Sequence, residues 1–129
     1  MLEDEQKEEK LYQLKMIKLE SLKKSDHFKN VLNGKKFHTN FYSIFATKNF
    51  LKPNKNRLLI SFITKKKIGN AVVRNKIRRK LKAITMKILK IKGAINTNYT
   101  YIIICKTNSY TEKYDKIFLE MQKSFKKFN

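Results

Sequence analysis

The sequence predicts an α+β fold, with helices packed against a single sheet of about four strands. Apolar segments at 36–47, 57–64 and 99–106 have the length and composition of strands. Apolar residues recur at helical spacing in three other segments, and the longest of these lies between the second and third strands. The expected order is therefore α-β-β-α-β-α, with room for one extra short strand.

Residues 1–21 are predicted to form an N-terminal extension that is mobile or loosely helical. They are rich in Glu, Lys and Leu and contain no Gly or Pro, but their apolar residues do not keep a helical spacing. The chain has 129 residues, of which 41% are hydrophobic, so residues 22–129 can form one domain with one core.

The first helix of this domain is expected from Ser25, a suitable N-cap, to Gly34, a suitable terminator. Residues 36–47 are predicted to form one long strand because side chains of two kinds alternate along it. The alternation places five residues on one side of that strand: Phe37, Thr39, Phe41, Ser43 and Phe45. A loop containing the only proline, Pro53, is expected before the second strand at 57–64.

A long helix is predicted from Asn70 to near Lys90, and a final helix after Ser109, which has capping-box spacing to Glu112. The long helix has an apolar stripe: Val73, Ile77, Leu81, Ile84 and Ile88. It lies between the strands at 57–64 and 99–106, which predicts a β-α-β unit with parallel strands. The usual rule makes such a crossover right-handed.

The charge of the chain predicts a polyanionic partner. The formal net charge is +21, and the segment from Lys29 to Thr111 holds 16 Lys and 4 Arg without one Asp or Glu. Such a surface repels itself, so nucleic acid is the first candidate partner and an anionic membrane the second. The acidic start of the chain, the lack of a long apolar stretch and the single cysteine, Cys105, together favour a cytoplasmic protein.

The long helix presents a cationic face opposite its apolar stripe, formed by Arg74, Asn75, Arg78, Arg79 and Lys82. A solvated face normally mixes charges, whereas like charges at i,i+4 cost about 0.2–0.5 kcal/mol per pair. The turn at Gly69 and Asn70 adds free backbone N–H groups at the positive end of the helix dipole. This face is therefore predicted to bind phosphates, and the alternative is an ordinary solvated surface.

Three phenylalanines, Phe28, Phe41 and Phe45, are candidates for stacking unpaired bases if one face of the sheet is open. The alternative for each ring is ordinary core packing. Cys105, His27 and His38 have no zinc-site spacing, and the central segment has no carboxylate to bind a metal or act as a base. We therefore expect neither catalytic nor metal-binding residues in this protein.

Residues 66–82, KKIGNAVVRNKIRRKLK, closely resemble the signature of the bacterial ribonuclease P protein subunit, and weaker resemblance extends over 22–128. This resemblance implies a subunit of a ribonucleoprotein endonuclease that removes the 5′ leader of precursor tRNA. It implies that the RNA subunit carries out hydrolysis with magnesium, and that the protein alone binds no cofactor. Its implied partners are the catalytic RNA and precursor tRNA, with no membrane and no stable protein partner. The family also implies a left-handed crossover.

The resemblance assigns residues to two RNA sites. Those matched to the site for the catalytic RNA are Lys66, Lys67, Gly69, Asn70, Arg74, Asn75, Lys76, Arg78, Arg79 and Lys82. The resemblance matches Phe28 and Phe45 to the aromatic residues of a leader-binding cleft between the first helix and the sheet. The residues predicted for this cleft are Phe28, Phe41, Phe45, Lys67 and Arg74. Lys76 stands where the family has arginine, which should preserve phosphate attraction but lose bidentate recognition. Leu59 and Lys106 also depart from the family pattern, and an extra residue in 64–67 leaves Ser61 unassigned.

Two other functions remain open at this point. One is a structural or ribosomal RNA-binding protein with no part in cleavage. The other is a membrane-surface protein that uses the basic amphipathic helix. The second requires the apolar stripe of that helix to face lipid, although the flanking strands need the same stripe as their cover.

Overall fold

A five-stranded mixed sheet with strand order β1-β4-β5-β3-β2 organises the computed structural model, which describes residues 17–51 and 56–129. The expectations for residues 1–16 and for Pro53 lie outside these ranges. The strands are β1 (Lys18–Glu20), β2 (Lys35–His38), β3 (Tyr42–Lys48), β4 (Arg57–Ile63) and β5 (Tyr99–Cys105). The predicted α+β class is confirmed, with one strand more than the expected four.

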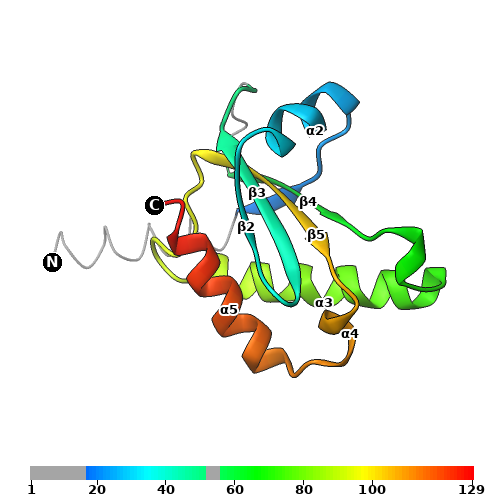
Figure 1. The fold of residues 1–129 in the computed structure, drawn as a ribbon. Coiled ribbons are helices and arrows are strands. Elements are labelled where there is room, and N and C mark those ends of the chain that lie inside the picture. The colour runs from blue at the N-terminus through cyan, green and yellow to red at the C-terminus, as the bar shows by residue number, and fades with distance from the viewer. Residues whose placement is uncertain (1–16, 52–55) are drawn as a thin grey trace, which may run out of the picture.

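Helices cover both faces of this sheet (Figure 1). Their bounds are α2 (Ser25–Leu32), the 3-10 turn η1 (Lys66–Ile68), α3 (Ala71–Leu89), α4 (Asn108–Thr111) and α5 (Tyr114–Lys126). Helices α3 and α5 lie against one face, and α2 lies against the other. None of the helices within the described residues combines the length and apolar character that crossing a bilayer requires.

The β4-α3-β5 unit matches its prediction closely. β4 and β5 pair in parallel, with Ile60 opposite Tyr101 and Phe62 opposite Ile103. Helix α3 begins after Asn70, whose Oδ1 accepts a hydrogen bond of 3.0 Å from the Val73 amide. Four of the five residues of the predicted apolar stripe are completely buried: Ile77, Leu81, Ile84 and Ile88. Burial of this stripe joins the two parallel strands to their crossover helix.

The prediction of one long strand at 36–47 is wrong, because the chain reverses at Thr39 to form the β2-β3 hairpin. The Thr39 hydroxyl accepts hydrogen bonds from the amides of Phe41 and Tyr42 and donates one of 3.0 Å to the Tyr42 carbonyl. This turn contains no Gly or Pro, so alternation alone did not reveal it. The reversal puts Phe37 opposite Ile44, and hence on the other face of the sheet from Phe45.

The predicted N-cap at Ser109 is also wrong. Ser109 is buried within α4, where its hydroxyl donates to the Lys106 carbonyl at 2.6 Å. Helix α5 begins only at Tyr114, after Lys113. Oε1 of Glu112 accepts a hydrogen bond of 3.1 Å from the Lys113 amide, so the Glu112 carboxylate lies at the start of α5 rather than inside it. The short helix α4 intervenes because Ser109 bonds back to the end of β5.

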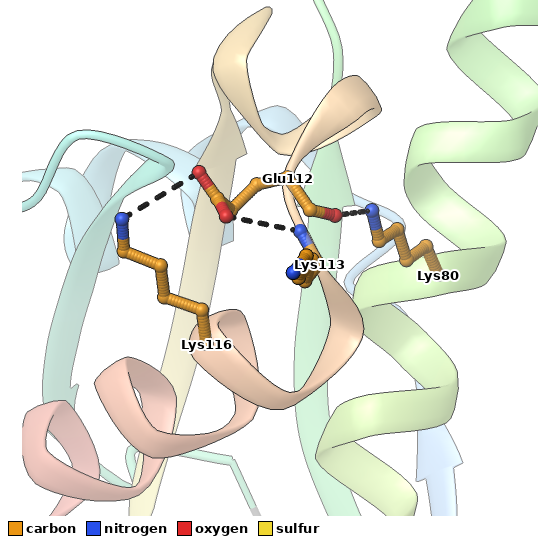
Figure 2. A network of polar contacts seen from close by, with 4 residues as sticks. All are labelled: Lys80, Glu112, Lys113 and Lys116. Atoms are coloured by element: carbon orange, nitrogen blue, oxygen red, sulfur yellow. Dashed lines mark hydrogen bonds and ion pairs between the residues drawn. The ribbon is translucent and has the colours of Figure 1, made fainter.

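Figure 2 shows how Lys80 ties α3 to this connection. Its Nζ donates to the carbonyl oxygens of Ser109, at 3.0 Å, and Glu112. The Glu112 carboxylate in turn lies 3.7 Å from Nζ of Lys116, which is in the first turn of α5. Lys80 therefore satisfies carbonyl groups at the end of α4, and its charge serves the fold rather than the cationic face of α3.

The end of the predicted extension forms an edge strand, which corrects its assignment for residues 18–20. β1 pairs in parallel with β4, and Leu19 lies opposite Leu58. The Leu22 amide donates a hydrogen bond of 2.9 Å to Ser61 Oγ. Glu20 forms an ion pair with Arg57, with 3.3 Å between Oε1 and Nη1. This short strand has little pattern of its own, and it forms because β4 offers an unpaired edge.

A buried hydroxyl pair links the sheet to α5. Tyr42 Oη lies 2.6 Å from Ser124 Oγ, and Ser124 donates its own proton to the Glu120 carbonyl at 2.9 Å. Since Ser124 has one proton, Tyr42 must be the donor in this pair. Burial raises the pKa of the Tyr42 hydroxyl above its ordinary value.

Replacing Tyr42 by phenylalanine should lower the free energy of unfolding by about 1 kcal/mol, because one buried hydrogen bond is lost. Urea unfolding followed by circular dichroism measures this change. The matched control is Tyr110→Phe, since Tyr110 is 40% exposed and should tolerate the change within about 0.5 kcal/mol. Equal stability of Tyr42→Phe and the parent protein would contradict the proposed donor.

Candidate nucleic-acid interface

The N-terminal half of α3 forms a cationic ridge, defined here as Arg74, Asn75, Lys76, Arg78, Arg79 and Lys82. Asn75, Lys76, Arg79 and Lys82 are exposed, whereas Arg74 and Arg78 are half-buried. The apolar stripe of the same helix faces the core. The predicted division of α3 into an apolar and a cationic face is therefore confirmed.

Arg78 is held in place by two neighbours. Its Nη1 donates a hydrogen bond of 2.8 Å to Oγ1 of Thr64, the residue just after β4, and its Nη2 donates a hydrogen bond to Asn75 Oδ1. Asn75 accepts through Oδ1, so its Nδ2 group remains available as a donor. These bonds fix the guanidinium and the amide relative to each other, and both keep donors for an outside acceptor.

Arg74 is placed differently. Its Nε is shielded from solvent and has no hydrogen-bond partner among the described residues. A shielded donor without an acceptor costs about 1–3 kcal/mol. The residue as a whole is nevertheless only half-buried. The Nε group of Arg74 thus makes no stabilising hydrogen bond within the described residues.

The turn before α3 has the geometry that the sequence predicts. Lys66 and Lys67 are exposed in η1, and Gly69 and Asn70 follow. A Cβ at Gly69 would lie only 3.2 Å from the Cβ of Val73, so glycine allows this close approach. The Asn70 side chain accepts a hydrogen bond from the Val73 amide. The cap therefore uses one of the N–H groups expected to be free for phosphate.

The charge of the ridge has no partner of opposite sign within the described residues. The two ion pairs there join Arg57 to Glu20 and Lys116 to Glu112, and both lie outside α3. No Asp or Glu occurs between Lys29 and Thr111 in the sequence. Several adjacent positive charges thus share one exposed surface, which is the electrostatic signature of polyanion binding.

A separate cleft of about 370 Å³ lies on the α2 face of the sheet, beside η1. Its lining combines cations with an aromatic ring and aliphatic carbon: His38, Ser43, Phe45, Lys65, Lys67, Ile68, Ile104 and Lys106. Phe45 and Phe28 of α2 both pack against the hydrophobic cluster on this face. The cleft is thus chemically suited to a flexible anion with apolar parts.

The family model described as Ribonuclease P matches residues 16–129 of this sequence. The chain belongs to the ribonuclease P protein family. This match starts within the segment predicted as an extension, which agrees with the incorporation of residues 18–20 into the sheet.

Relatives of this chain are ribonuclease P protein components from other bacteria. The protein from Fusobacterium nucleatum subsp. nucleatum is 35% identical over 114 residues, covering 84% of this chain and 96% of the relative. The protein from Helicobacter pylori is 30% identical over 146 residues, covering 97% of this chain and 84% of the relative.

Solved ribonuclease P proteins share the fold. The Thermotoga maritima protein aligns with a TM-score of 0.68 at 18% identity, covering 84% of this chain and 96% of that one. The Staphylococcus aureus protein aligns with a TM-score of 0.58 at 23% identity, covering 84% and 93%. At these identities the likeness supports the arrangement of elements, including the mixed sheet and its covering helices.

The structure separates the residues predicted for the leader cleft of this ribonuclease P protein. Phe45 and Lys67 line the cleft, and Phe28 lies in the cluster beside it. Phe41 is only 7% exposed and belongs to the core on the α3 and α5 face, so its assignment to the cleft is wrong. The β2-β3 turn is the reason, because Phe41 lies within it and outside the alternation of β3. Arg74 is not among the residues that line the cleft.

Sequence reasoning missed His38, Ser43, Lys65 and Lys106 in the cleft. His38 and Ser43 come together only through the hairpin register, with His38 Nδ1 2.7 Å from Ser43 Oγ. Lys65 immediately precedes the motif at 66–82, and this position in the sequence could have indicated its place in the cleft. Ser61, left unassigned by the resemblance, is buried and accepts from the Leu22 amide. Its hydroxyl therefore serves to fix the chain just after β1 to β4.

Cys105 also borders the cleft but is only 2% exposed. Burial raises the pKa of its thiol to about 12, and the positive charge of Arg78 offsets part of that rise. The thiol is therefore protonated at neutral pH and inert as a nucleophile. Within the described residues, no group of three or more His, Cys, Asp and Glu side chains is arranged to hold a metal ion.

Proposed function

We propose that this chain is the protein subunit of ribonuclease P that binds the catalytic RNA through the cationic ridge of α3. As a ribonuclease P protein component, the chain takes part in an endoribonuclease complex. The single observation that carries the proposal is that the charge of the ridge has no partner of opposite sign in the part of the chain that the structure describes. Phosphate binding by such a ridge releases counterions from RNA, which supplies affinity without requiring a particular sequence.

The cleft beside η1 is proposed to hold the single-stranded 5′ leader of precursor tRNA. Lys65 and Lys67 can neutralise leader phosphates, while Phe45 offers a ring for stacking an unpaired base. A volume of about 370 Å³ lies in the range of ligand clefts. The cleft and the ridge lie on different faces of the sheet, so leader and catalytic RNA can bind at the same time.

Hydrolysis is proposed to be the work of the RNA subunit with bound magnesium, in the cytoplasm. The protein contributes positive charge, which reduces the repulsion between substrate and catalytic RNA. Its own side chains offer no carboxylate between Lys29 and Thr111 for base or metal chemistry. The alternative of a structural or ribosomal RNA-binding protein shares the ridge but predicts no effect on cleavage.

Reconstitution with the catalytic RNA and precursor tRNA at limiting magnesium tests the whole proposal. The protein should increase the rate of leader removal severalfold over RNA alone, because it replaces part of the charge neutralisation that magnesium provides. Binding to the catalytic RNA without any stimulation would instead identify a structural RNA-binding protein.

Arg79→Ala is expected to weaken binding to the catalytic RNA and to reduce the slope of log affinity against log salt by about one. The Arg79 side chain makes no hydrogen bond or ion pair within the described residues, so its removal should leave the fold intact. Lys123→Ala removes an equal charge from the exposed surface of α5 and serves as the control. If both variants keep the parent slope, the ridge is not the interface.

Phe45→Leu is expected to weaken binding of precursor tRNA about tenfold while leaving mature tRNA binding unchanged, because one stacking contact with the leader is lost. Filter binding to the assembled enzyme measures both. The control is Phe37→Leu, since Phe37 is also half-buried but lies on the other face beneath Lys127. Equal losses for precursor and mature tRNA would assign Phe45 to packing.

A further inference from the structure

A second hollow, of about 340 Å³, opens between the cationic ridge and the edge of the sheet. Its apolar floor comes from three side chains, Leu19 of β1 and Ile60 and Phe62 of β4. Its rim comes from α3, through Asn75, Arg78, Arg79 and Lys82. All three floor residues pack with the core on the α3 face, so this hollow lies on the opposite face of the sheet from the leader cleft.

The packing of α3 explains why the hollow exists. One flank of α3 packs against α5, and the ridge is on the flank that overhangs β4 and β1. β1 completes the floor with Leu19, and it is held there by the Leu22 amide bonded to Ser61 and by the Glu20 to Arg57 pair. Phe62 is half-buried, so part of its ring remains accessible from this side.

The hollow combines two chemistries that one ligand would need to match. Its rim carries three cations, and none of the acidic side chains that the structure describes lines it. Glu20 is the nearest carboxylate along the chain, but strand alternation directs Glu20 and Leu19 to opposite faces, and Glu20 pairs with Arg57. The floor is aromatic and aliphatic. An ion such as inorganic phosphate would use only the rim, whereas a planar apolar group with an attached anion would use both.

We propose that this hollow takes one unpaired nucleotide of the RNA bound to the ridge, with its base on Phe62 and its phosphate between Arg79 and Lys82. The proposal rests on the proposed function and names what the ridge recognises. A regular RNA duplex keeps its bases stacked and would offer only phosphates, whereas a bulged or looped nucleotide can extend its base to an aromatic ring. The free Nδ2 group of Asn75 can then donate a hydrogen bond to that base. Arg78 stays fixed at the rim of the hollow, because it donates a hydrogen bond to Thr64.

Substitution of Phe62 tests the proposal in the full chain. Phe62→Leu keeps apolar volume but removes the ring, and should weaken binding to the catalytic RNA about tenfold. The salt dependence should keep its parent slope, because no charge is lost. Phe118→Leu is the matched control, since Phe118 is half-buried against the same core but does not line the hollow. Thermal unfolding establishes that both variants fold.

A second measurement needs no variant. Adenosine 5′-monophosphate, titrated into the parent protein, should shift the NMR signals of the Leu19 and Ile60 methyl groups and the Phe62 ring. Inorganic phosphate should leave these signals unchanged. Identical shifts with phosphate, or no shift of these groups with the nucleotide, would overturn the proposal.

The two proposals fail separately. If Arg79→Ala weakens RNA binding and Phe62→Leu does not, the ridge binds RNA through phosphates alone and the nucleotide site is wrong. If neither substitution matters, the ridge itself is not the interface. A loss with Phe62→Leu that Phe118→Leu matches would reflect a general disturbance of the core and would also overturn the nucleotide site.

Discussion

Burial of the apolar stripe of α3 against the sheet is the interaction on which the rest of the structure depends. The stripe gives β4 and β5 their cover, and the fully buried Ile77, Leu81 and Ile84 fix the rotation of the helix about its axis. Once that rotation is set, the residues opposite the stripe must face solvent. The positions of the cationic ridge and of the hollow beneath it follow from hydrophobic packing rather than from any attraction between charges.

The two faces of the sheet are covered unequally, and this creates two distinct surfaces. Helices α3 and α5 together cover one face, while α2, with eight residues, covers only part of the other. The uncovered part near η1 forms the cleft that Phe45 and Lys67 help to line. The domain thereby has two separate cationic surfaces, and β5 is the central strand of the sheet between them.

The chain accepts an electrostatic cost that its partner would relieve. A net charge of +21 on 129 residues opposes the compact state, and the ridge forms no ion pair with an acidic side chain in residues 17–51 and 56–129 to reduce that repulsion. Lys80 shows the contrast, because it is satisfied by the carbonyls of Ser109 and Glu112 and so contributes to folding. Apart from Arg78, the cations of the ridge make no side-chain hydrogen bond or ion pair within the described residues, which is consistent with a surface whose stability improves when RNA binds.

The sequence by itself determined the fold class, the boundaries of α3 and its two faces, because helical periodicity and the Asn70 cap are local signals within about twenty residues. The family resemblance rested on the same local segment. Only the tertiary structure decided the β2-β3 reversal, the edge strand β1 and the start of α5. Each depends on partners distant in the chain or on a side-chain hydrogen bond that periodicity does not encode: the open edge of β4, the Thr39 hydroxyl, and the bond from Ser109 to Lys106. The β2-β3 reversal places Phe41 in the core and brings His38 to the cleft, because the turn residues interrupt the two-residue alternation that the sequence suggested across 36–47.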